Sequence, residues 1–201
     1  MGLYQDRILP RLIDLVMRNE RLTPYRQRAI SQAEGRVLEI GAGSGLNLPF
    51  YTGAATEILG LEPHPKLRDL ARGRQCGVPW TTVDGSAEAI PLEDASVDTV
   101  VSTWTLCSIP GVSQALAEAR RVLKPGGKFL FVEHGLAPDA GVRRWQDRLT
   151  PAWKRVAGGC YLNRPIQKLV QQAGFDITQL QTGYMPGPRP MTFTYEGCAR
   201  R

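Results

Sequence analysis

The stretch Val37-Leu38-Glu39-Ile40-Gly41-Ala42-Gly43-Ser44-Gly45 decides the fold of this 201-residue chain. A short run typical of a buried strand is followed by three glycines at alternate positions, and a helix is expected to open at Leu46-Asn47. Glycines let the backbone adopt positive φ angles and let a flat, polar ligand lie against the main chain. The stretch therefore predicts a ligand site where a parallel strand ends.

A second acidic position supports this interpretation. The apolar run Ile58-Leu59-Gly60-Leu61 ends at Glu62, which falls at the end of the next expected strand. A carboxylate in that place can accept hydrogen bonds from both hydroxyls of a ribose. The glycine turn and the carboxylate together indicate a nucleoside site at the carboxyl ends of adjacent parallel strands.

The spacing of the glycines separates two nucleoside ligands. A dinucleotide site requires Gly-x-Gly-x-x-Gly, but Gly45 comes one residue too early and Leu46 stands in the third place. The pattern Glu39-x-Gly41-x-Gly43-x-Gly45 instead resembles motif I of the class I S-adenosylmethionine (SAM) methyltransferases. The resemblance implies that the acid and the loop receive the amino-acid end of SAM. A tight turn without a ligand is the alternative for such a loop taken by itself.

Apolar runs and helical patterns alternate along the chain, which predicts an α/β fold with a mostly parallel sheet and helices on both faces. The expected strands cover 36–40, 56–61, 78–83, 96–102 and 127–133, with two late antiparallel strands at 175–182 and 191–196. The expected helices cover 8–18, 64–74, 112–123 and 163–173. We expect residues 36–201 to form one Rossmann-like methyltransferase domain with a seven-stranded sheet, and residues 1–35 to form a helical lid.

The later motifs follow the order of the same family. They are Leu61-Glu62-Pro63-His64-Pro65, the loop Gly85-Ser86-Ala87-Glu88-Ala89-Ile90-Pro91-Leu92, the strand Ser96-Val97-Asp98-Thr99-Val100-Val101, and the helix end Arg121-Val122-Leu123-Lys124-Pro125-Gly126-Gly127. The resemblance implies that Glu62, Pro63, Ser86, Ala87 and Thr103 contact the cofactor. Ser86 replaces the usual acid of the adenine loop. Asp84, two residues earlier, is interpreted as a strand-end residue.

A narrower resemblance lies further along the chain. Thr105-Leu106-Cys107-Ser108-Ile109, Val132-Glu133-His134, Pro151-Ala152-Trp153 and Gly159-Cys160-Tyr161-Leu162-Asn163-Arg164 are similar to the methyltransferase-like seven family. Its animal members are membrane-associated alkyl-thiol S-methyltransferases, so the resemblance implies a thiol acceptor. The chain lacks their N-terminal apolar anchor, and we expect a soluble, bacterial-type relative. Quinone and phospholipid methyltransferases share the general motifs, which leaves oxygen, nitrogen or carbon acceptors open.

The candidate catalytic residue is His134, at the end of the fifth expected strand. It is interpreted as a general base or thiolate partner, with a hydrogen-bonded structural histidine as the alternative. Cys107 and Cys160 are candidate nucleophiles or metalloid ligands, but a role as small buried hydrophobes is favoured. The residues expected to line an apolar acceptor pocket, or else to pack, are Trp104, Cys107, Trp145, Trp153 and Tyr161. Asn163 and Arg164 are interpreted as caps of the helix that follows them.

Composition limits partners and location. No run of about 18 apolar residues is present, so a membrane span is not expected. Four scattered cysteines without a Cys-x-x-Cys pair argue against a metal site and a disulfide framework, and favour a reducing, cytoplasmic location. The net charge of +6 gathers in the flanks. Such flanks can attract nucleic acid, an anionic membrane surface or an acidic substrate, but a solvated arginine-rich surface is favoured.

The apolar face of the first expected helix has two interpretations. Its members are Ile8, Leu9, Leu12, Ile13, Val16 and Met17. A helix of this kind can lie on a membrane surface, but packing against its own domain is favoured. Peripheral membrane contact therefore stays open, and a monomer or weak homodimer is expected.

The leading hypothesis is a SAM-dependent methyltransferase acting on a small, largely apolar acceptor, with a thiol sulfur as first choice. Methylation of oxygen, nitrogen or carbon on a quinone, lipid or natural product is the nearest alternative. A non-catalytic SAM-binding module is the alternative of another class. An RNA substrate is disfavoured because the chain has neither an Asn/Asp-Pro-Pro-aromatic motif nor an appended RNA-binding domain. No nucleic-acid partner is therefore expected.

Overall fold

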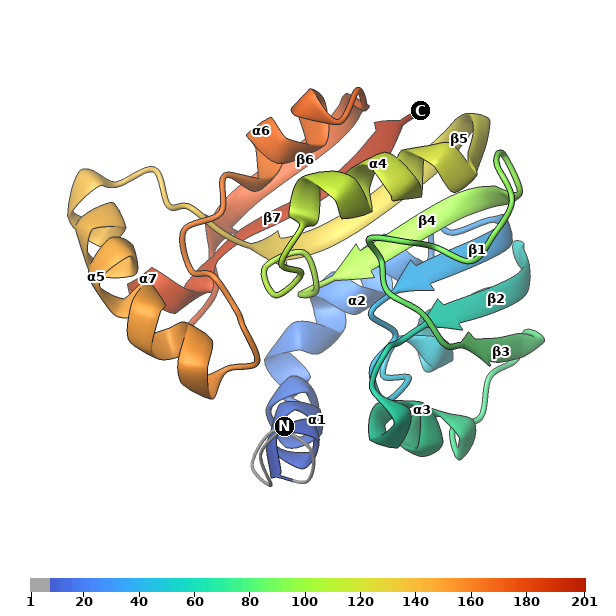
Figure 1. Ribbon diagram of the computed structural model, residues 1–201, viewed down its shortest axis with the longest axis horizontal. Coiled ribbons are helices and arrows are strands. Elements are labelled where there is room, and N and C mark those ends of the chain that lie inside the picture. Colours follow the sequence, from blue (N-terminus) through green and yellow to red (C-terminus); the bar gives the residue numbers. More distant parts are fainter. Residues whose placement is uncertain (1–7) are drawn as a thin grey trace.

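The computed structural model describes residues 8–201 and contains one seven-stranded sheet of order β3-β2-β1-β4-β5-β7-β6 (Figure 1). The strands are β1 Gly35–Ile40, β2 Ala55–Leu61, β3 Trp80–Val83, β4 Val97–Thr103, β5 Leu123–His134, β6 Asp176–Tyr184 and β7 Phe193–Arg200. The first five strands are parallel, and β7 is antiparallel to both β5 and β6. This arrangement confirms the predicted Rossmann-like methyltransferase fold.

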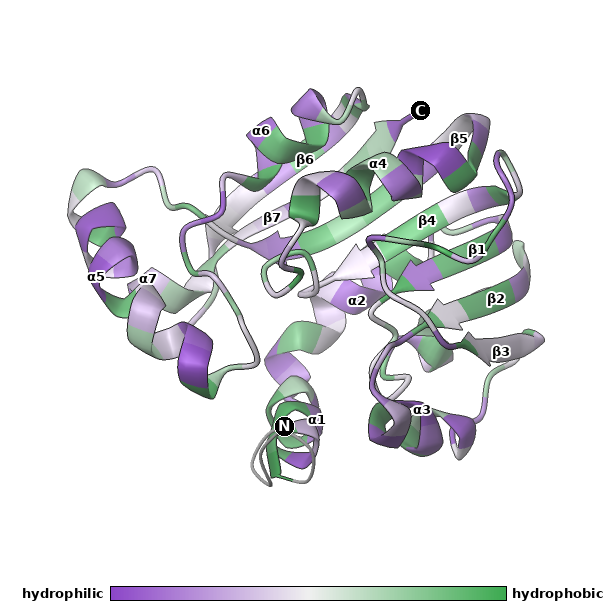
Figure 2. Ribbon diagram, viewed as in Figure 1, coloured by the Kyte–Doolittle hydropathy of each residue, from purple (hydrophilic) through white to green (hydrophobic). Residues whose placement is uncertain are grey.

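Helices cover both faces of the sheet. They are α1 Leu9–Met17, α2 Thr23–Ile30, α3 Pro65–Arg72, α4 Val112–Val122, α5 Ala140–Val156, α6 Ile166–Gln172 and α7 Arg189–Thr192, with short 3-10 helices η2 Glu20–Leu22 and η3 Leu48–Phe50. Side chains alternate across a strand, so Leu38 joins a core shared with α4 and α6, while Val37 joins a second core with Ile30 of α2. Apolar strands accordingly form the middle of the molecule (Figure 2).

The topology brings the predicted site residues to one edge. β1 lies between β2 and β4, with Ile40 opposite both Leu61 and Ser102, and Thr103 lies opposite Val132. The order of the strands along the sheet changes direction between β1 and β4, and ligands of such sheets bind beyond the carboxyl ends of the strands there. The arrowheads of the parallel strands β1, β2 and β4 point toward the side of the molecule where α5 lies (Figure 1).

Three local expectations are corrected by the structure. The chain after motif I forms turns and then η3, not a helix opening at Leu46-Asn47, because Asn47 and Tyr51 turn inward to hydrogen-bond Glu39. α2 was not expected as a separate helix, and α5 occupies a segment for which no helix was predicted.

The predicted lid divides into two parts. α2 is a core helix, since Ile30 is fully buried against the sheet. In α1, Leu9 is buried, but Leu12 and Val16 are 44% and 59% exposed, so the expectation that this whole apolar face packs on the domain is wrong. Residues 1–7 of the predicted lid lie outside the described residues. Among residues 8–201, no helix combines the length and apolar character needed to cross a membrane.

Candidate active site

The motif I loop leaves space for a ligand at its middle glycine. Gly41, Gly43 and Gly45 all have positive φ angles, of 67°, 56° and 75°. A Cβ atom on Gly41 would collide with the side chain of Thr105, and one on Gly45 would lie 2.8 Å from Leu48. At Gly43 the nearest protein atom would be 3.9 Å away. The outer glycines therefore serve close packing, whereas the middle one faces open space.

Glu39 anchors the residues that follow this loop through hydrogen bonds to Asn47 and Tyr51. Its buried carboxylate accepts hydrogen bonds from Asn47 Nδ2 (2.8 Å) and Tyr51 Oη (2.7 Å). Asn47 also donates to Thr103 Oγ1 (2.9 Å) and accepts from Arg26 (2.8 Å). Burial raises the pKa of Glu39 to about 7, against the hydrogen bonds that lower it. Glu39 can therefore change its charge near neutral pH when a cationic group approaches.

Glu62 ties the loop to the second strand. Its Oε2 accepts from the backbone N–H of Gly43 (3.0 Å) and its Oε1 from that of His64 (2.9 Å). Burial raises the pKa of Glu62, while these two bonds lower it. Each carboxylate oxygen keeps a lone pair for a further donor, so two adjacent hydroxyl groups can be received.

The loop predicted to contact adenine is held by Glu88, an acid to which the sequence interpretation gave no role. Ser86 donates its hydroxyl to Glu88 (2.7 Å), and Glu88 in turn accepts from the backbone N–H of Gly111 (2.6 Å). Ala87 is buried, whereas Pro63 is exposed. Asp84 pairs with Arg68 (2.7 Å). The Ser86 oxygen keeps acceptor capacity, and Asp84 serves the strand end as expected.

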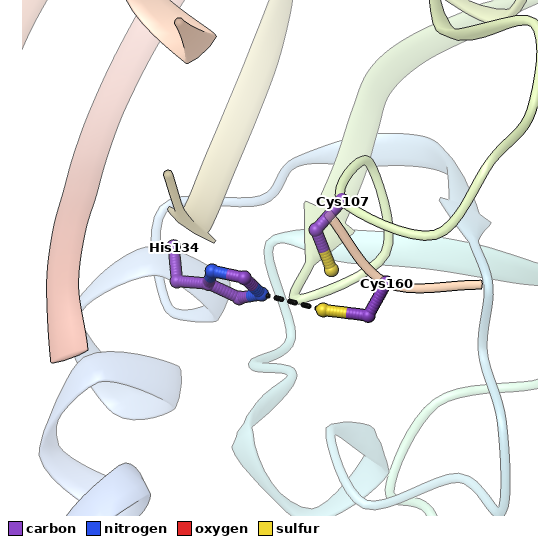
Figure 3. Close-up of side chains that lie close together, drawn as sticks. All are labelled: Cys107, His134 and Cys160. Atoms are coloured by element: carbon purple, nitrogen blue, oxygen red, sulfur yellow. Dashed lines mark hydrogen bonds between the residues drawn. The ribbon is translucent and has the colours of Figure 1, made fainter. Parts of the chain in front are cut away.

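Three residues far apart in sequence converge beyond β4 and β5. The side chains of Cys107, His134 and Cys160 point toward one another (Figure 3), and their ligating atoms all lie within 4.8 Å of one another. His134 Nε2 lies 3.0 Å from Cys160 Sγ, and all three residues are buried. The hydrogen bond from Cys160 and the nearby His134 lower the pKa of Cys107. The pKa of His134 is raised overall: burial lowers it, but the charge of Cys107 together with other neighbours raises it by more.

The loop that carries Cys107 is held by hydrogen bonds to two side chains, those of Glu133 and Arg164. Glu133 Oε1 accepts from the backbone N–H groups of Thr105 (3.0 Å) and Leu106 (3.1 Å). Arg164 donates to the carbonyl oxygens of Leu106 and of Ile109, the latter at 2.6 Å. Burial raises the pKa of Glu133 to about 8. The loop is therefore held in place before any ligand binds.

The aromatic residues predicted to line the acceptor pocket have different surroundings. Trp153 interacts with the Cys160 thiol, and the Tyr161 ring lies under the Arg164 guanidinium at 4.3 Å. Trp104 directly follows β4 and has a positive φ of 49°. Trp145 is instead 56% exposed, with Arg148 over its ring. The structure thus brings Trp153 to the cysteine-histidine cluster, places the Trp104 ring under the Arg26 guanidinium at 4.9 Å and leaves Trp145 at the surface.

α1 contacts both halves of the site. Buried Asp14 accepts from the Ser44 hydroxyl in the motif I loop and pairs with Arg18 at 2.6 Å. On the neighbouring face, carbon atoms of Leu9 and Ile13 lie 3.5 Å from the position that a Cβ at Gly158 would occupy. Because Gly158 lies two residues before Cys160, α1 spans from the motif I loop to the turn that precedes this cysteine.

Sequence interpretation missed several supporting residues. Arg164 was expected to cap a helix, but α6 begins after Pro165 without a side-chain cap, and the guanidinium reaches the Cys107 loop. Asn47, Tyr51 and Arg26 carry no motif signal. Glu133 was visible as an acid inside an apolar strand, since buried carboxylates need partners. That signal could have identified it.

The chain is similar in sequence to known proteins. Residues 38–131 match the family described as "Methyltransferase domain". The chain contains a methyltransferase domain. The domain is similar to Thiol S-methyltransferase TMT1B of Rattus norvegicus, with 34% identity over 161 residues that cover 77% of this chain and 65% of the relative. The chain thus spans slightly less than two thirds of that relative's length.

Other similarities are broader. The ubiquinone/menaquinone biosynthesis C-methyltransferase UbiE of Rubrivivax gelatinosus is 31% identical over 130 residues, covering 64% of this chain and 45% of the relative. A crystal structure of a SAM-dependent methyltransferase from Thermotoga maritima, titled a possible histamine N-methyltransferase, superposes with a TM-score of 0.69 at 24% identity, covering 96% and 98% of the two chains. The last similarity shows the class I methyltransferase fold.

The methyltransferase domain implies SAM as cofactor, and the residues present fit it. Gly43 offers open space over the loop, Glu62 offers paired acceptor atoms for a ribose, and Glu39 provides an acid beneath the loop. The predicted cofactor residues therefore lie along one continuous edge from β1 to β4.

Proposed function

We propose that this protein is a SAM-dependent methyltransferase whose acceptor is a small, largely apolar thiol. The observation that carries the proposal is that a nucleoside-binding edge, built around Gly43 and Glu62, ends at a buried cluster of Cys107, His134 and Cys160. The 34% identity to a thiol S-methyltransferase supports sulfur as the acceptor atom.

In this proposal the chain's own residues bind and orient the cofactor. Glu62 accepts the ribose hydroxyls, Glu39 attracts the cationic amino-acid end, and Ala87 and Ser86 contact the adenine. When bound, SAM supplies a methyl group on a sulfonium sulfur, which keeps the bonding electron pair and leaves as neutral S-adenosylhomocysteine.

The acceptor side supplies positive charge and a dry environment. A thiol has a pKa near 8.5 and needs only modest help to ionise. His134 and Arg164 lie beside the Cys107 loop and favour a thiolate there. Such a site suits sulfur better than an alcohol, whose much higher pKa requires a stronger base.

α1 acts in this proposal as the lid. Its contacts with Ser44 and with the turn at Gly158 support this role. Covering the site excludes water and strengthens the electrostatic interactions inside it.

The test is the formation of S-adenosylhomocysteine, measured by mass spectrometry. The acceptors are alkyl and aryl thiols, matched alcohols and amines, and a quinol with a short isoprenoid tail. Turnover confined to the thiols is the expected result. Turnover of the quinol alone would show that the acceptor is a quinone precursor and not a thiol. The similarity to UbiE favours this alternative. SAM binding without turnover on any acceptor would contradict an enzymatic role with these substrates.

A further inference from the structure

The cluster of Cys107, His134 and Cys160 has the donor set of a zinc site. The sequence argued against a metal because its cysteines are scattered, but the fold brings two thiol sulfurs and one imidazole nitrogen within 4.8 Å of one another. Two cysteine sulfurs and a histidine nitrogen are ligands that Zn²⁺ prefers. Figure 3 shows both sulfurs and the ring facing a common centre.

The spacing is close to that of a tetrahedral metal. Zinc–sulfur bonds of about 2.3 Å and zinc–nitrogen bonds of about 2.0–2.1 Å place ligand atoms about 3.6–3.8 Å apart. The 3.0 Å between His134 Nε2 and Cys160 Sγ must open by about half an ångström. Rotation of the Cys160 side chain about χ1 moves its sulfur by distances of this order.

The ligands stand on fixed elements. Cys107 lies in the loop that Glu133 and Arg164 hold by its backbone N–H and carbonyl groups. His134 is the last residue of β5, and the backbone N–H of Tyr161, next to Cys160, donates to Cys107 O at 2.8 Å. The donor atoms are therefore held close before a metal binds, which lowers the entropic cost of coordination.

Two residues at this cluster carry unpartnered polar atoms. Among residues 8–201, the buried atoms without a hydrogen-bond partner include His134 Nδ1 and Glu133 Oε2. His134 is 9% exposed and Glu133 is fully buried. Buried polar groups are normally satisfied, so the cluster is a polar site inside an otherwise apolar interior.

We propose that Cys107, His134 and Cys160 bind one Zn²⁺ and that the acceptor thiol takes the fourth coordination position. Three protein ligands with one open position distinguish a catalytic zinc from a structural one. The incoming thiol displaces a metal-bound water and gives its proton to solvent, so the acceptor is bound as a thiolate. The identity of the acceptor rests on the proposed function, whereas metal binding does not.

The charges of the site balance in this arrangement. Two cysteine thiolates neutralise Zn²⁺, and the acceptor thiolate adds one negative charge. Arg164 lies on the Cys107 loop with its guanidinium on the carbonyl oxygens of Leu106 and Ile109, where it can offset that charge. Glu133 holds the same loop through the backbone N–H groups of Thr105 and Leu106.

The first part of the test measures metal binding in the full chain. Protein stripped with a chelator is titrated with Co²⁺ and Zn²⁺, and sulfur-to-cobalt charge-transfer absorption and zinc content are recorded. We expect one metal per chain, and a loss of at least about 100-fold in zinc affinity in Cys107→Ser, Cys160→Ser and His134→Gln. Cys76→Ser is the matched control, because Cys76 lies elsewhere in the second core. Unchanged SAM affinity establishes that each variant is folded.

The second part adds acceptors. An alkanethiol should change the visible spectrum of the cobalt-loaded protein, whereas the matched alcohol should not. Folded, SAM-binding protein that takes up neither metal would overturn the inference. Metal-free protein that methylates thiols at the rate of zinc-loaded protein would also overturn it, while leaving the proposed function intact. Zinc bound through these three residues without turnover of any thiol would leave the metal site standing and defeat the proposed function instead.

Discussion

The cofactor half and the acceptor half of the site are built in different ways. The cofactor half consists of strand ends and backbone groups, with Gly43 and Glu62 joined by a hydrogen bond across neighbouring strands. The acceptor half consists of reactive side chains from Cys107, His134 and Cys160, which lie up to 53 positions apart in the chain. The first half therefore appears as local motifs, and the second exists only in the folded molecule.

The largest effect is expected from a substitution at Gly43, which should affect the cofactor half of the site only. Gly43→Val should reduce SAM affinity by more than about 100-fold, because a branched side chain fills the ligand space and is strained at a positive φ. Isothermal titration with SAM measures the change. Gly53→Ala is the control, since a Cβ there meets no atom within 4 Å. Wild-type SAM affinity in Gly43→Val would sink the cofactor assignment.

The acceptor half is tested at His134. His134→Ala should lower thiol turnover by about 100-fold while leaving SAM affinity within about twofold, since loss of an acid–base or charge-stabilising group acts on the transfer. Steady-state rates and SAM titration are measured on the same sample. Trp145→Ala, at the exposed surface of α5, should change neither. An unchanged turnover rate in His134→Ala would reduce this residue to a structural role.

A smaller effect is expected at the ribose acceptor. Glu62→Ala should weaken SAM binding by about 10–100-fold, because charge-assisted hydrogen bonds to two hydroxyls are lost. Glu57→Ala removes an exposed carboxylate paired with Arg36 and should leave binding unchanged. Titration of both variants gives the comparison. Equal affinities for the two would show that Glu62 does not contact the cofactor.

The smallest effect is a pH dependence from Glu39. Burial raises the pKa of Glu39 to about 7, so its charged fraction increases from about one tenth at pH 6 to about nine tenths at pH 8. The charged form attracts the cationic end of SAM, and affinity should therefore rise by up to about tenfold over this range. Glu39→Gln should remove most of the dependence. A fall in affinity with rising pH would have the wrong sign for this mechanism.

The residues that we assign to the cofactor could be proposed from the sequence because their signals are local. The alternate glycines Gly41, Gly43 and Gly45 indicate a backbone with positive φ angles, and Glu62 directly follows an apolar run typical of a strand. Alternating patterns also located β6 and β7 and their antiparallel pairing. These features depend on neighbours within a few positions, which a single sequence displays.

The acceptor half could be predicted only in part. His134 was identified from its place at a strand end, but its 3.0 Å approach to Cys160 depends on how α5 returns the chain to the sheet. Arg164 was taken for a helix cap because the sequence does not show that its side chain reaches Leu106 and Ile109. Long-range packing decides such contacts, and no local pattern encodes them.

A structure of the full chain with bound S-adenosylhomocysteine tests the meeting of the two halves most directly. We expect the ribose on Glu62, the amino-acid end over Gly43 and above Glu39, and the thioether sulfur facing Cys107 and His134 from across the end of β4. A sulfur directed away from that cluster, or a ligand bound at another edge of the sheet, would contradict the account.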